Sequence, residues 1–98
     1  MNHADLLEGV YRVTVSVAPS PSSASALLRL VSVIHRRGTD VQSVDFTVAA
    51  DHNAHMTATF ASFPGRAATL VRSFQGAVCV TDARLEVWSA GHWAPQTL

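Results

Sequence analysis

The chain has 98 residues, of which 48% are hydrophobic and 14% are charged, and its formal net charge is zero. This length allows a single domain with a modest core, and the composition is that of a globular rather than a disordered chain. Seven basic and seven acidic side chains cancel, which argues against a nucleic-acid-binding protein, because such proteins carry a basic excess. So little charge favours a surface that associates with another chain.

Cysteine usage and hydropathy indicate the compartment. The single cysteine, Cys79, has no internal disulfide partner and suits a reducing environment. Residues 1–8 include acidic side chains and no apolar core segment, so we expect no signal peptide. No apolar run approaches the roughly 20 residues of a membrane helix. The sequence therefore predicts a cytoplasmic protein that does not enter the membrane.

The first predicted element is a strand over residues 11–17, where apolar and polar side chains alternate. The side chains expected to face the core are Tyr11, Val13, Val15 and Val17. Pro19 and Pro21 end the strand, because proline removes a backbone donor and fixes φ.

A helix is predicted after this proline-containing loop, with Ser22 or Ser23 as its N-cap. Apolar side chains at three- and four-residue steps form its expected buried stripe, which comprises Ala24, Leu27, Leu28, Val31, Ile34 and His35. Arg36 and Arg37 suit the negative end of the helix dipole. Gly38 can adopt the left-handed backbone conformation that commonly ends a helix.

A β-hairpin is predicted next, with strands over residues 41–50 and 54–61. The turn between them, residues 51–53, reads Asp-His-Asn, and Asp and Asn tolerate positive φ. The inward side chains are expected to be Val44, Phe46, Val48 and Ala50 on the first strand and Met56, Ala58 and Phe60 on the second.

The last third of the chain predicts a helix and a strand. The helix opens near Pro64, stops at Gly76, and has a buried stripe of Ala67, Leu70, Val71 and Phe74. The strand covers residues 78–88, and a change in the phase of its alternation predicts a bend or bulge near Thr81 and Asp82.

The order of these elements is βαββαβ, which predicts the α+β, ferredoxin-like class: a four-stranded antiparallel sheet with two helices on one face. We expect residues 1–8 to be a lead-in, residues 9–88 to form the domain, and residues 89–98, with Trp93, to be a tail. The opposite face of the sheet should be rich in hydroxyl groups, contributed by Thr14, Ser16, Thr47, Thr57 and Thr59.

No constellation of catalytic or metal-binding residues stands out. His52 and His55 flank a turn without the four ligands that structural zinc requires, so we interpret them as solvated. No serine lies in a G-x-S-x-G motif, Cys79 has no CxxC partner, and no glycine-rich phosphate loop is present. We therefore expect no catalytic residue, no metal site and no cofactor bound by this chain.

Three other interpretations are weaker. Arg36 and Arg37 could hold an anion, although compensation of the helix dipole explains them more simply. An RNA-binding sheet needs exposed aromatic side chains, whereas Tyr11 and Phe46 are expected to face the core. A small acylphosphatase-like enzyme needs a glycine-rich anion loop with an arginine, and the Pro/Ser loop lacks both.

Residues 35–44, His-Arg-Arg-Gly-Thr-Asp-Val-Gln-Ser-Val, resemble the segment that joins the first helix to the second strand in ACT domains. The R-R-G-x-x-V-x-S run is similar in particular to the small regulatory subunit of acetolactate synthase (acetohydroxyacid synthase), short single-domain type. In length, element order and hydrophobic pattern the resemblance covers residues 11–88.

The resemblance implies an effector site at a dimer interface, where an amino acid, typically valine, contacts the loop after the first strand and the partner's helix-end loop. Free amides at a helix N-terminus suit a carboxylate. By position in this sequence, the effector-binding residues would be Pro19, Ser20, Ser22, Ser23, Asp40 and Val41.

Two positions depart from the family pattern. The Asn-x-x-Gly of the first loop is replaced by a proline- and serine-rich stretch without glycine, and Asp40 stands where the family has asparagine. The resemblance implies a non-catalytic subunit that forms a homodimer and activates the large, thiamine-diphosphate-dependent catalytic subunit in branched-chain amino-acid biosynthesis. The departures predict weak or absent sensitivity to valine. The alternative is a free-standing ACT-type amino-acid sensor or interaction module for another enzyme.

Overall fold

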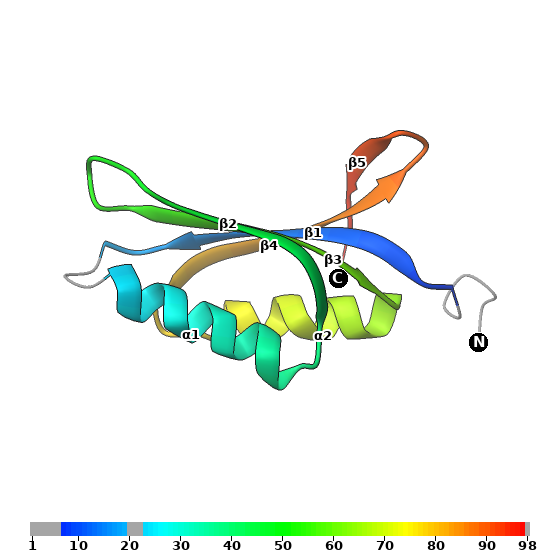
Figure 1. Ribbon diagram of the computed structural model, residues 1–98. Helices are drawn as coiled ribbons and strands as arrows, with labels where there is room; N and C mark the ends of the chain where they lie inside the picture. Colours follow the sequence, from blue (N-terminus) through cyan, green and yellow to red (C-terminus); the bar gives the residue numbers. More distant parts are fainter. Residues whose placement is uncertain (1–6, 20–22, 98) are drawn as a thin grey trace.

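The computed structural model describes residues 7–19 and 23–97 of the chain. Its strands form one antiparallel sheet in the order β2-β3-β1-β4-β5, and both helices lie on the same face of that sheet (Figure 1). The elements are β1 (Gly9–Val17), α1 (Ser23–Arg36), β2 (Asp40–Val48), β3 (Ala54–Ser62), α2 (Pro64–Gln75), β4 (Val80–Ser89) and β5 (His92–Pro95).

The predicted α+β class and the βαββαβ order are confirmed, but the prediction of four strands is wrong. The additional strand, β5, lies in the segment that the sequence predicts to be a tail. Ala90 and Gly91 both have positive φ, 52° and 83°, and turn the chain back so that Trp93 pairs with Trp88. A two-residue turn of this kind matches the twist of the strands that it joins. The resulting hairpin rises on the side of the sheet away from the helices (Figure 1).

The central strand, β1, carries the core. It pairs with β3 over residues 9–17 and with β4 over residues 11–17. Burial raises the pKa of the Tyr11 hydroxyl, and the Tyr11 ring stacks on Phe60 with 5.9 Å between ring centroids. The predicted alternation is confirmed, because the buried side chains of β1 are Tyr11, Val13, Val15 and Val17.

Helix α1 packs through a face whose buried residues share only Ile34 with the stripe that the sequence predicts. Leu28 is 67% exposed and Val31 is 41% exposed, and Ala24 and His35 are also exposed. The helix is apolar at every position from 26 to 34 except Arg29 and Ser32, so a stripe of three- and four-residue steps can be drawn on two faces. Packing against the sheet and against α2 selects the second face, whose buried side chains are Ala26, Leu30, Val33 and Ile34.

Helix α2 follows the prediction closely. Pro64 occupies the first turn of the helix, where a backbone N–H would have no partner within the helix, so proline is tolerated. Phe63 precedes it in extended conformation. The Gly76 N–H donates to the Arg72 carbonyl at 3.0 Å, which confirms the predicted stop. The predicted stripe of α2 is confirmed, since its buried side chains are Ala67, Leu70, Val71 and Phe74. Neither α1 nor α2, the helices of the described residues, has the length and apolarity needed to cross a bilayer.

Strand β2 is the least covered part of the sheet. It forms one edge, and Val44 and Val48 lie opposite the buried residues Ala58 and Ala54 of β3, on the helix side. They nevertheless remain 40% and 42% exposed. Ala50, expected to face inward, lies beyond the end of β2 and is exposed. The helix side of this edge is therefore a partly open apolar strip.

Strand β4 begins at Val80 rather than at Val78, which lies in the preceding turn and is 97% exposed. The register of β4 against β1 shifts by one residue, which leaves Thr81 as an extra residue. Such an insertion is a β-bulge and increases the local twist. The irregularity predicted near Thr81 and Asp82 is confirmed.

The turn after α1 needs a residue in the left-handed region. Gly38 has φ of +61°. Its N–H donates to the His35 carbonyl at 3.0 Å, and the Thr39 N–H donates to the Ile34 carbonyl at 3.3 Å. These two bonds form the Schellman arrangement and satisfy carbonyls that the helix end leaves free. The predicted role of Gly38 is confirmed, and the turn directs the chain into β2.

We expect Gly38→Ala to lower the free energy of unfolding by about 1 kcal/mol. A Cβ at this position meets no atom within 4 Å, so the loss comes from backbone strain alone. Gly65→Ala is the matched control, since Gly65 has equal space and no positive φ. Urea denaturation followed by circular dichroism measures both variants. Equal stability of the two would contradict the assignment of the turn.

Candidate functional site

Of the residues expected to bind an effector, the four that the structure describes lie at the two ends of α1. Pro19 is exposed, and Ser23 is the exposed first residue of the helix. Ser20 and Ser22 lie outside the described residues. At the other end, Asp40 is the exposed first residue of β2.

A single chain does not bring these two groups together. Helix α1 has 14 residues, and at 1.5 Å per residue it spans about 21 Å. Val41, which lies opposite the buried Phe60, packs against the core. A joint site for one amino acid would therefore need the helix-end loop of a second copy.

A small hollow does lie beside the helix-end turn, with a volume of about 150 Å³. Its lining includes two carboxylates, Glu8 and Asp40, and two guanidinium groups, Arg37 and Arg66. Binding sites for drug-sized ligands occupy about 300–1,000 Å³, so this hollow suits only a small polar group. Because its charges cancel, neither an anion nor a cation is favoured there.

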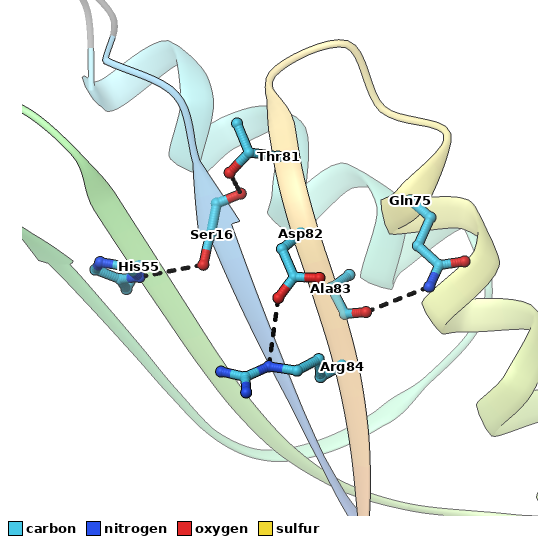
Figure 2. Close-up of polar contacts among 7 residues, drawn as sticks. All are labelled: Ser16, His55, Gln75, Thr81, Asp82, Ala83 and Arg84. Atoms are coloured by element: carbon cyan, nitrogen blue, oxygen red, sulfur yellow. Dashed lines mark hydrogen bonds and ion pairs between the residues drawn. The ribbon is translucent and has the colours of Figure 1, made fainter. Parts of the chain in front are cut away.

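The sheet face away from the helices carries the hydroxyl groups that the sequence predicts. Ser16 on β1 faces His55 on β3, with 3.4 Å between Oγ and Nδ1 (Figure 2). Asp82, opposite Ser16 on β4, is paired with Arg84 at 3.3 Å rather than with the histidine. An activated serine needs a base that a third group orients, and no carboxylate contacts His55 among the described residues. This row is a solvated polar network rather than a catalytic arrangement.

The turn between β2 and β3 holds the second histidine of the predicted pair. His52 has φ of 67° and is exposed, as is His55. Asp51 accepts hydrogen bonds from the side-chain and backbone N–H groups of Asn53 at 2.8 and 3.0 Å, and these bonds lower the pKa of its carboxyl group. Within residues 7–19 and 23–97 no three His, Cys, Asp or Glu side chains gather as metal ligands would.

The most tightly built group on this face was not expected from the sequence. Arg12 forms an ion pair with Glu86 at 2.8 Å, and its guanidinium carbon lies 4.7 Å from the ring centroid of Trp93. Trp93 in turn meets Trp88 edge to face at 5.2 Å. These contacts fix the β4–β5 hairpin. In the sequence, Gly91 is the one signal of this hairpin, because glycine favours the positive φ that a two-residue turn requires.

No family model and no curated protein matches the chain. Solved structures match it in fold. The C-terminal domain of the MgtC protein from Mycobacterium tuberculosis has a TM-score of 0.68 at 16% identity, covering 94% of this chain and 97% of that one. An uncharacterized protein from Thermotoga maritima has a TM-score of 0.70 at 11% identity, covering 85% of this chain and 100% of that one.

A homoserine dehydrogenase from Thiobacillus denitrificans also matches, with a TM-score of 0.62 at 6% identity. The match covers 84% of this chain but 18% of the dehydrogenase chain. At these identities the similarity establishes a shared α+β fold, which is compatible with the ferredoxin-like class, and says nothing about activity.

Proposed function

We propose that the chain is the non-catalytic regulatory (small) subunit of an acetolactate synthase. It acts in the cytoplasm in branched-chain amino-acid biosynthesis, forms a homodimer of ACT-type domains, and activates the large catalytic subunit. Thiamine diphosphate belongs to that large subunit. Valine regulates this small subunit weakly or not at all.

The observation that carries the proposal is where the R-R-G-x-x-V-x-S run lies in the fold. Its glycine, Gly38, closes α1 with φ of +61°. The register between Val41 and Ser43 shifts in the same run, so Gln42 forms a bulge at the start of β2. The run that resembles the family thus coincides with a bulge and a left-handed turn, both of which constrain the residues that can stand there. This coincidence supports a shared local structure.

A second observation supports a dimer. Strand β4 is paired with β5 on its outer side, whereas the outer edge of β2 has no paired strand among the described residues. Val44 and Val48 lie on the helix side of β2 and are 40% and 42% exposed. Unpaired edges with exposed apolar side chains tend to associate. A second copy placed edge to edge through β2 would extend the sheet and cover this strip.

The alternative, an ACT-type module serving another enzyme, is favoured by one finding. Two of the matched structures are parts of larger proteins, one a C-terminal domain and one 18% of an enzyme chain. Domains of this fold therefore also accompany unrelated proteins, and the identity of the partner decides between the two functions.

The test is to mix the purified chain with the large catalytic subunit of acetolactate synthase from the same organism. The proposal predicts that the two co-elute in size-exclusion chromatography and that the rate of acetolactate formation rises until the small subunit saturates. The heat-unfolded chain serves as the control. If the two do not co-elute and the rate does not change, the proposed function is wrong.

We also expect weak or no valine binding by this chain. Pro19 and Pro21 remove two amide donors from the first loop and restrict its backbone, and Asp40 places a negative charge where a carboxylate would lie. Isothermal titration with millimolar valine should give no saturable heat. A variant that combines Asp40→Asn with Pro21→Gly should gain binding. Saturable binding to the unaltered chain at micromolar valine would contradict this expectation.

A further inference from the structure

The zero net charge of the chain conceals a strong separation of charge. All seven basic residues are arginines, and neither α1 nor α2 contains an aspartate or a glutamate. The two ion pairs of the described residues, Arg12–Glu86 and Arg84–Asp82, both lie on the sheet. The helical layer therefore presents arginines without a carboxylate partner among the described residues, namely Arg29, Arg36, Arg37, Arg66 and Arg72.

A continuous groove runs along the line where α1 meets α2. It consists of two adjoining hollows of about 420 and 560 Å³, which share Val33, Arg36 and Gly76 in their linings. We call it the seam groove. Arg37 and Arg72 line one end, and Leu28 and Val78 line the other together with Arg29. We call the first the cationic end and the second the apolar end, because the second adds two exposed aliphatic side chains to a single further arginine.

The cationic end is held in place before any ligand arrives. The Arg37 Nε–H donates to the Ser73 hydroxyl oxygen at 2.9 Å, and the Ser73 hydroxyl donates to the Thr69 carbonyl at 3.0 Å. This chain of bonds orients the guanidinium, and its terminal N–H groups have no partner among the described residues. A guanidinium held by one edge can bind a carboxylate with little further loss of side-chain freedom.

The apolar end is exposed without any role in the core. Val78 is 97% exposed and Leu28 is 67% exposed. The turn that carries Val78 is nevertheless ordered by two backbone bonds, from Ala77 N–H to the Phe74 carbonyl at 3.0 Å and from Val80 N–H to the Ala77 carbonyl at 3.1 Å. Large aliphatic side chains displayed on an ordered turn beside cations are typical of a protein-binding surface.

We propose that the seam groove binds an acidic segment of a partner protein, with carboxylates at the Arg37–Arg72 end and one large apolar side chain at the Leu28–Val78 end. Charge complementarity carries the choice of occupant, because the four arginines that line the groove, Arg29, Arg36, Arg37 and Arg72, form no ion pair within the described part of the chain and no carboxylate lines the groove. A single-stranded nucleic acid fits less well, since no aromatic side chain lines the groove on which a base could stack. The site stands independently of the acetolactate synthase proposal, because a segment of this chemistry can belong to any partner protein.

The probe is a fluorescein-labelled peptide of four Glu-Glu-Leu repeats, titrated with the full chain at low salt and followed by fluorescence anisotropy. We expect saturable binding that weakens as salt is added. Arg36→Gln and Arg72→Gln should each weaken it about threefold, as for one partly exposed ion pair. Arg84→Gln is the matched control, since it removes the same charge from the opposite face of the sheet and should leave the affinity unchanged.

The apolar end needs its own comparison. Val78→Ser should weaken binding of the Glu-Glu-Leu peptide but not of a Glu-Glu-Ser peptide, because the second has no side chain to fill that end. Val78 is so exposed that its replacement should not affect folding, which the melting temperature checks.

Three results would overturn the proposal. One is an equal loss of affinity in the Arg84 variant and in the helix variants. Another is equal affinity for the two peptides. The third is displacement of the bound peptide by a short oligouridylate, or by phosphatidylglycerol vesicles, at lower concentrations than unlabelled peptide requires. No acetolactate synthase subunit is present, so failure here leaves the proposed function untouched.

Discussion

The pairing of β1 on both of its edges is the constraint on which the rest of the fold depends. Its inward side chains are buried to 4% exposure or less, and two of them, Val13 and Val15, are fully buried. Side chains of β3 and β4 extend the same apolar layer to either side. Burying each of these valines contributes about 1.5–3 kcal/mol. A slip of one residue in β1 would turn the whole set to the solvent, so the register of the neighbouring strands is fixed as well.

Two short helices then have to cover this layer, and they cover it unevenly. With 14 and 12 residues, α1 and α2 span about 21 and 18 Å. At the β4 edge the chain protects itself: β5 pairs with residues 86–89 of β4, and the Gln75 side chain reaches the Ala83 carbonyl at 3.3 Å (Figure 2). At the β2 edge no further strand and no such side-chain bond lies among the described residues, and the side chains of Val44 and Val48 are partly exposed. The two edges are therefore built for different surroundings.

The parts of the fold that depend on local physics could be predicted from the sequence. The alternation of apolar and polar side chains predicted β1, and four apolar positions predicted the buried stripe of α2. Gly38 predicted a helix end in the left-handed backbone conformation. The face of α1 could not be predicted, because its middle is apolar almost all round and only packing against the sheet and α2 selects Leu30 over Leu28. Strand β5 is short and owes its place to contacts between Trp93, Trp88 and Arg12, which are distant in the sequence or lie across a turn.

The candidate site, too, could be predicted from the sequence only in part. The sequence identified the helix-end turn correctly, and the predicted helix already separated Asp40 from the first loop within one chain. It did not reveal the charge of the helical layer, since the arginines are scattered along the chain and the contact between the two helices brings Arg36, Arg37 and Arg72 together. Sites composed of several elements depend on tertiary and quaternary structure, which local patterns do not encode.

The central claim is that a second copy covers the open β2 edge, and sedimentation equilibrium at micromolar concentration tests it most directly. The chain mass is 10.5 kDa, and we predict a particle of twice that mass. Val44→Lys should shift the equilibrium to the single chain, whereas Val78→Lys, the same change at an exposed valine of the helical layer, should leave the dimer intact. A single-chain mass for the unaltered protein, or a Val44→Lys variant that remains dimeric, would contradict the claim.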